Sequence, residues 1–215
     1  GDRIATLEDN SKEAVDIFLG AAIANLVRVP LYARDSHEAH VHKMGHTDCK
    51  ALIASAAYAE EAGRAAADVP SVEHVLIRDD RYEAWLASQS SDDPKLEVQP
   101  YDLYIIRHTG GTTGNSKAVA YTHWKWLAVA RDWFYCIPRV LVGDTCIHVG
   151  PISHASGYCF IPIWLGGGVN VMVDKFDPEH VLDLMEHERA AFVLAVPTIL
   201  NALNQCPSMS RRDWS

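Results

Sequence analysis

The sequence predicts an α/β fold in which largely parallel sheets are covered by helices. Short apolar runs of strand length alternate along the chain with longer segments in which apolar residues recur at helical spacing. This alternation is typical of parallel sheets with both faces covered. The chain has 215 residues, 48% of them hydrophobic, so it can bury a sizeable core as one large domain or two small ones.

The first half of the chain begins with an amphipathic helix, because apolar residues recur at helical spacing from Ala14 to Leu26. Asn10 and Glu13 form a capping box at its start, and Val29-Pro30-Leu31 leaves it in extended form. Ser36 caps a second helix. Four more elements follow: a strand at Lys50–Ala54, a helix at Ala56–Ala67, a strand at Val72–Ile77 and a short helix at Tyr82–Ala87.

Ser88–Pro100 is polar and acidic and contains two prolines, so a weak internal boundary is expected near residues 88–100. Beyond it, Leu103–Ile106 is a strand, Ala118–Tyr121 is a short strand, and Thr122 caps a helix that runs to Ile137. The remaining expected elements are strands at Thr145–Val149, Val169–Val173 and Ala191–Val196, and helices near Pro178–His187 and Thr198–Asn204.

Composition narrows the function classes. The formal net charge is −9 and no basic stripe is present, which argues against a nucleic-acid surface. The apolar run Tyr158–Leu165 is interrupted by Pro162 and too short to span a bilayer, and from the first residues we expect no signal peptide. Five scattered cysteines without a C-x-x-C pair favour free thiols in a reducing compartment. We therefore expect a cytoplasmic protein.

The most informative motif is the stretch Thr109-Gly110-Gly111-Thr112-Thr113-Gly114-Asn115-Ser116-Lys117. Glycine lets backbone N–H groups approach a ligand, threonine adds hydroxyl donors and lysine supplies a mobile positive charge, a combination that suits a polyphosphate. The spacing fits neither the Walker A loop nor the dinucleotide fingerprint. A solvated turn rich in small residues remains open, although it explains the glycines and not the three threonines with a lysine.

This stretch resembles the phosphate loop of adenylate-forming enzymes, the superfamily of acyl- and aryl-CoA synthetases, peptide-synthetase adenylation domains and luciferases. Two flanking segments share the resemblance: Gly1–Ala5 with the helix after Asn10, and Pro151-Ile152-Ser153-His154-Ala155-Ser156-Gly157, which is similar to the family's Pro-x-x-His-x-x-Gly motif. The family usually has Pro-Lys-Gly where this chain has Ser116-Lys117-Ala118. Loss of the proline frees φ and predicts a more mobile loop.

The resemblance implies an ATP-dependent ligase with Mg²⁺ as cofactor. Thr109, Gly110, Gly111, Thr112, Thr113, Gly114 and Lys117 would hold the β- and γ-phosphates. His154 would lie near the acyl pocket and the reacting carboxylate. A carboxylic acid would be activated as acyl-AMP and passed to a thiol, most simply that of coenzyme A.

The family's adenylation domains for amino acids carry an aspartate near the His154 motif, and this chain has none there. A fatty or aryl acid is therefore expected. A non-catalytic nucleotide- or acyl-binding module and an adenylation domain that loads a carrier protein remain alternatives. A homodimer is also left open.

The resemblance also implies that residues 1–215 are an incomplete N-terminal domain. The family's adenine, ribose and magnesium motifs and its small C-terminal domain would follow Ser215, so we expect the segment alone to be inactive.

Four histidines, His37, His40, His42 and His46, cluster on the second predicted helix. The pairs 37/40 and 42/46 have spacings that can share a helix face. A zinc site would need further ligands, and no H-E-x-x-H pattern is present. We therefore expect exposed surface histidines and no metal centre.

Overall fold

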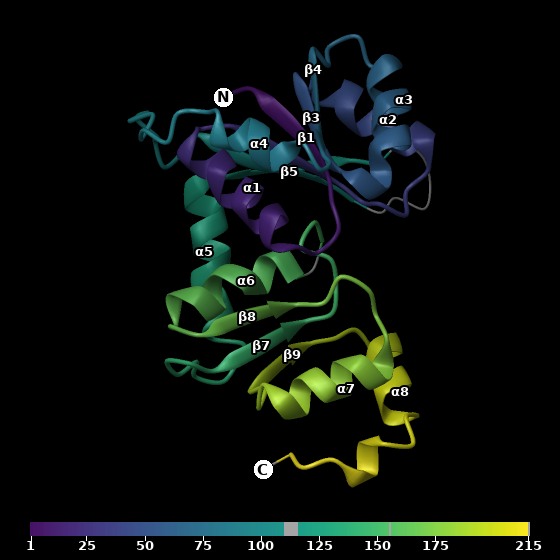
Figure 1. Ribbon diagram of the computed structural model, residues 1–215. Coiled ribbons are helices and arrows are strands. Elements are labelled where there is room, and N and C mark those ends of the chain that lie inside the picture. The colour runs from purple at the N-terminus through teal and green to yellow at the C-terminus, as the bar shows by residue number, and fades with distance from the viewer. Residues whose placement is uncertain (110–115, 155, 215) are drawn as a thin grey trace. The chain divides into compact units, whose positions relative to one another are not determined.

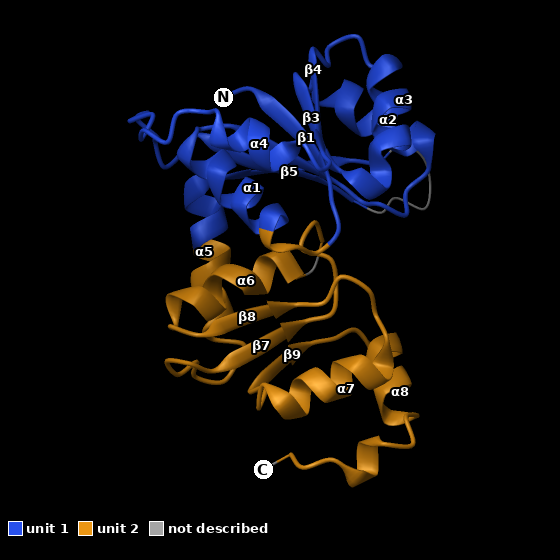
Figure 2. Cartoon of the chain, in the orientation of Figure 1, with its two compact units in different colours: residues 1–9, 13–127 blue, residues 10–12, 128–215 orange. Residues whose placement is uncertain are grey.

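The computed structural model describes residues 1–109, 116–154 and 156–214, and it divides into two compact units (Figures 1 and 2). Unit 1 comprises Gly1–Asp9 and Glu13–Leu127, and unit 2 comprises Asn10–Lys12 and Ala128–Ser215. The division falls inside helix α5 (His123–Trp133). The segment 88–100, where we expected a weak boundary, lies within unit 1.

Unit 1 is built on a six-stranded sheet. Its strands, in spatial order, are β4 (His74–Arg78), β3 (Ala51–Ser55), β1 (Arg3–Leu7), β2 (Val27–Leu31), β5 (Leu103–His108) and β6 (Ala118–Thr122). All neighbouring strands are parallel except β5 and β6, which are antiparallel. The predicted, largely parallel sheet is therefore confirmed.

Helices cover both faces of this sheet (Figure 1). On one face, α2 (His37–His46) and α3 (Ala59–Ala67) bury Met44 and Ala62 against strand residues such as Leu52. On the other, α1 (Lys12–Ile23) packs Phe18 edge-on against Tyr104 with the ring centroids 5.5 Å apart. The short α4 (Tyr82–Ala87) has the bounds that the sequence predicts.

Unit 2 is built on a three-stranded parallel sheet in the order β8 (Val169–Met172), β7 (Thr145–His148) and β9 (Phe192–Leu194). Helix α6 (Ser156–Leu165) packs Cys159 and Ile163 against Cys146. Helices α7 (Pro178–His187) and α8 (Pro197–Asn204) pack against the β7 side chains on the other face of this sheet, such as Ile147. Gly167, at φ +82°, makes the tight turn between α6 and β8.

The helix expected to run to Ile137 ends at Trp133, and two elements were not predicted from the sequence. Strand β1 was not predicted, although it lies between β2 and β3 in the middle of its sheet. Helix α6 was not predicted either, and it accommodates Pro162 in its interior. No helix among the described residues is long and apolar enough to cross a membrane.

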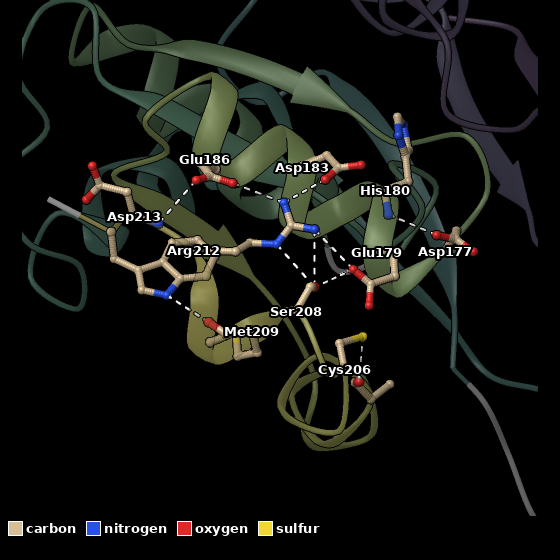
Figure 3. Close-up of polar contacts among 12 residues, drawn as sticks. Asp177, Glu179, His180, Asp183, Glu186, Cys206, Ser208, Met209, Arg212 and Asp213 are labelled. Carbon is tan, nitrogen blue, oxygen red and sulfur yellow. Dashed lines mark hydrogen bonds and ion pairs between the residues drawn. The ribbon is translucent and has the colours of Figure 1, made fainter.

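Arg212 lies in the segment that follows α8, and its side chain binds carboxylates of α7 (Figure 3). Its guanidinium forms ion pairs with Glu179 at 3.0 Å, Asp183 at 2.6 Å and Glu186 at 3.1 Å. These three carboxylates raise the pKa of Arg212, the Asp183 hydrogen bond contributing most. The contact explains why a polar segment follows an ordered path over unit 2.

Candidate functional site

The candidate phosphate loop joins two antiparallel strands. His108, the last residue of β5, pairs with Ala118, the first residue of β6. Next to this pair, the Thr109 N–H donates to the Lys117 carbonyl at 2.8 Å. The structure therefore brings Thr109 and Lys117 together at the neck of a hairpin, with both residues exposed. Gly110, Gly111, Thr112, Thr113 and Gly114 lie outside the described residues.

The position of this loop in a hairpin distinguishes it from Walker A loops, which lead directly into a helix. Here strand β6 comes first, as predicted, and α5 begins after it. The Lys125 N–H donates to the Thr122 hydroxyl at 3.2 Å, which confirms Thr122 as the helix cap. Among the described residues of the loop, Lys117 and Thr109 are exposed, and an ammonium and a hydroxyl can both donate to phosphate oxygens.

The expectation of exposed histidines on α2 is wrong for His40, which is 1% exposed. Glu61 on α3 is the reason: its carboxylate lies 2.9 Å from His40 Nδ1 and 3.1 Å from His37 Nδ1. The Tyr32 carbonyl lies 2.9 Å from His40 Nε2 and satisfies its other ring nitrogen. The sequence spacing predicted that His37 and His40 share one face of the helix. It could not predict that the Glu61 carboxylate, on another helix, lies beside them.

His42 and His46 extend to the phosphate loop. Their rings stack with centroids 5.4 Å apart, and His46 Nδ1 lies 3.4 Å from Nε2 of His108, the residue before Thr109. His42 Nε2 donates to the Ser116 carbonyl at 3.5 Å. The sequence analysis did not single out His108, although its position at the start of the loop was a usable signal. Among the described residues, no cluster of three or more His, Cys, Asp or Glu is arranged to hold a metal.

The pKa of His108 is lowered to about 4, and burial is the largest cause. The positive charge of Lys43 and the neighbouring His46 and His42 act in the same direction, while Asp35 opposes them. His108 is therefore neutral at neutral pH, and it adds no fixed charge beside the loop.

His154 lies in unit 2, between the carboxyl end of β7 and the first residue of α6. Its backbone N–H donates to the Pro151 carbonyl at 2.9 Å in a turn, and its side chain is exposed. Ligands of open parallel sheets bind at this end of the strands. The position of His154 on its own sheet is thus the one that the sequence predicts.

Asn10 holds the segment that carries His154, a role that the sequence analysis missed. Its side-chain amide donates to the carbonyls of Gly150 and Val173, both at 2.9 Å, and its oxygen accepts from the Ile152 N–H at 2.7 Å. The residue is 7% exposed. Asn10 was predicted as a helix cap, and α1 instead begins at Lys12.

Comparison with known proteins places this geometry in a family. A family model described as AMP-binding enzyme matches residues 1–214. The chain is 32% identical over 216 residues to the long-chain-fatty-acid–CoA ligase FadD13 of Mycobacterium tuberculosis, with 99% of this chain and 43% of that protein covered. It is 27% identical to a feruloyl-CoA synthase of an Amycolatopsis species, with 100% and 42% covered.

Solved structures agree. The N-terminal domain of FACL13 from Mycobacterium tuberculosis superposes with a TM-score of 0.92 at 29% identity, and the match covers 99% of this chain and 54% of that one. The chain thus spans less than half the length of the curated relatives named above. These findings confirm the resemblance read from the loop and its flanks, and the chain belongs to the family of AMP-binding enzymes.

Proposed function

We propose that the protein containing this chain is an ATP-dependent acid–CoA ligase that acts on a fatty or aryl carboxylic acid. The observation that carries the proposal is the phosphate loop at the neck of the β5–β6 hairpin, in a chain similar over its whole length to a fatty-acid–CoA ligase and a feruloyl-CoA synthase. The segment around His154 has no acid that would pair with a substrate ammonium, which supports an acid without an α-amino group.

The reaction has two steps. A carboxylate oxygen of the acid attacks the α-phosphorus of ATP, the α–β phosphoanhydride bond breaks, and pyrophosphate leaves. The thiolate of CoA then attacks the acyl carbonyl, the acyl–oxygen bond breaks, and AMP leaves. Both steps depend on positioning and on neutralising charge more than on covalent help from the protein.

The candidate residues of this chain would bind the phosphates and position the reacting carboxylate. Lys117 and Thr109, together with Gly110–Gly114, would bind the β- and γ-phosphates through an ammonium, hydroxyls and backbone N–H groups. Mg²⁺, when bound, would neutralise charge on the phosphate oxygens. The loop Thr109–Lys117 contains no carboxylate, and Mg²⁺ bound to phosphates needs few protein ligands. His154 would face the reacting carboxylate. Both assignments are proposals that follow from the motifs.

Acid-dependent exchange of labelled pyrophosphate into ATP tests the first step. The full-length protein should catalyse exchange with a fatty or an aryl acid and not with amino acids. Lys117→Ala should slow it by roughly 10- to 100-fold, because one charged hydrogen bond contributes about 1.5–3 kcal/mol. Lys125→Ala is the matched control: Lys125 is also exposed, lies on α5 and should leave exchange unchanged.

No exchange with any acid would contradict a ligase and favour a non-catalytic binding module, and exchange without an acid would contradict activation of a carboxylate. Exchange that Lys117→Ala leaves untouched would show that the loop does not hold phosphate. Residues 1–215 alone are expected not to catalyse exchange, and activity of that segment would refute the expectation that it is an incomplete catalytic unit.

A further inference from the structure

Two arginines lie inside buried strands of unit 1. Arg28 is the second residue of β2 and is 3% exposed, and Arg107 is near the end of β5 and is 7% exposed. The two strands are parallel neighbours, with Arg28 in register with Ile105. Strands of parallel sheets that are covered on both faces normally carry apolar residues, so two arginines here need an explanation.

Aromatic rings surround these guanidinium groups. Arg28 lies over the Phe18 ring at 4.9 Å and Arg107 over the Trp126 ring at 5.4 Å. The two rings are themselves in contact, with their centroids 6.1 Å apart. Arg28 and Arg107 are therefore held against one aromatic cluster on the α1 face of the sheet. Cation–π contacts stabilise a buried cation in part, but they satisfy none of its N–H donors.

The charge of Arg28 is poorly compensated. Its Nε donates to the Thr6 hydroxyl at 3.4 Å, a long hydrogen bond, and its Nη1 is buried without a hydrogen-bond partner among the residues that the structure describes. Glu8 contributes a favourable charge, yet its carboxylate is held by Arg78, whose Nε lies 3.0 Å from both oxygens.

Burial and the like charge of Arg107 lower the pKa of Arg28 to about 10, with Tyr104 and Glu8 opposing the shift. The guanidinium therefore remains charged at neutral pH. A buried cation without a carboxylate is costly, and an anion that accepts from its free N–H would remove that cost.

We propose that Arg28, with Arg107 beside it, binds a small oxyanion, either a carboxylate or inorganic phosphate, on the α1 face of the unit 1 sheet. The planar guanidinium fork matches the oxygen spacing of both ions. The Thr6 hydroxyl accepts from Arg28 Nε, and its own hydrogen would be a further donor to the anion. None of the residues Thr109–Lys117 is among the proposed ligands of this anion, so Lys117→Ala distinguishes this site from the one proposed for ATP.

Binding to the full-length protein is measured by equilibrium dialysis against labelled acetate and labelled phosphate at constant ionic strength in chloride. The two labels distinguish a carboxylate from a phosphate. We expect one bound oxyanion per chain that Lys117→Ala retains and Arg28→Met abolishes. The control is Arg64→Met, which removes a cation whose side chain is 58% exposed and should not change binding.

Thermal unfolding supplies a second readout. The preferred anion at about five times its dissociation constant should raise the midpoint of the wild type by about 1–2 °C over chloride. The Arg28→Met variant should show no such rise. We expect this variant to fold, because an apolar methionine replaces an uncompensated buried charge. Absence of bound label in the wild type, or equal binding to the wild type and Arg28→Met, would overturn the proposal.

Discussion

Asn10→Ala is predicted to lower the free energy of unfolding by about 3 kcal/mol. The side chain makes three hydrogen bonds to backbone groups of unit 2, at 2.7–2.9 Å, and each contributes about 1 kcal/mol net. Truncation leaves the carbonyls of Gly150 and Val173 and the N–H of Ile152 without this partner. Because Asn10 is only 7% exposed, water reaches these backbone groups poorly, and the loss can rise to about 4 kcal/mol.

The assay is urea unfolding of the full-length protein, followed by tryptophan fluorescence. Asn201→Ala is the matched control because Asn201 is exposed on α8, and it should change stability by less than about 0.5 kcal/mol. Asn10→Asp gives a sharper comparison. It keeps an acceptor for the Ile152 N–H but turns an oxygen towards the two carbonyls, so it should destabilise at least as much as alanine.

Asn10→Ala should also slow pyrophosphate exchange, because Gly150 and Ile152 lead directly to His154. Wild-type stability for both Asn10 variants would refute the reasoning. Destabilisation with unchanged exchange would refute only the link from Asn10 to His154.

Two further predictions concern unit 1. Tyr104→Phe should lower the free energy of unfolding by about 1 kcal/mol, because the buried hydroxyl donates to the Phe18 carbonyl at 2.7 Å; urea unfolding checks this, and an unchanged midpoint would contradict it. His108 binds a proton in the unfolded chain near its usual pKa of 6.5 but in the folded chain only near pH 4. Its contribution to stability is thus lost as the pH falls from 6.5 towards 4. His108→Phe should make the pH dependence shallower by up to about one proton, and an identical dependence in both proteins would exclude His108 as its source.

Local signals accounted for the elements that sequence could predict. The Ser36 hydroxyl accepts from the Ala39 N–H at 3.3 Å, as an N-cap requires, and the strand after the phosphate loop follows from the β-branched and aromatic residues before Thr122. Helix α6 was not predicted, and Pro162 is a local signal against a helix, but burial against β7 and β9 stabilises the helix around it. Tertiary packing outweighed the local signal.

For the candidate site too, local sequence signals revealed some residues and not others. The spacing and composition of Thr109–Lys117 identified the loop without any tertiary information. The roles of Asn10 and His40 could not be found in that way. Asn10 acts on residues about 140 positions away, and His40 is buried by a carboxylate 21 positions away. Long-range partners of polar side chains leave no periodic trace in a single sequence.

The central claim is that the acid is activated by attack of its carboxylate on the α-phosphorus of ATP. The most direct test supplies the full-length protein with an acid labelled with ¹⁸O in its carboxylate, together with ATP and CoA, and measures the products by mass spectrometry. The account predicts acyl-CoA and AMP that carries one ¹⁸O from the acid. Label in inorganic phosphate, or AMP without label beside newly formed acyl-CoA, would contradict it.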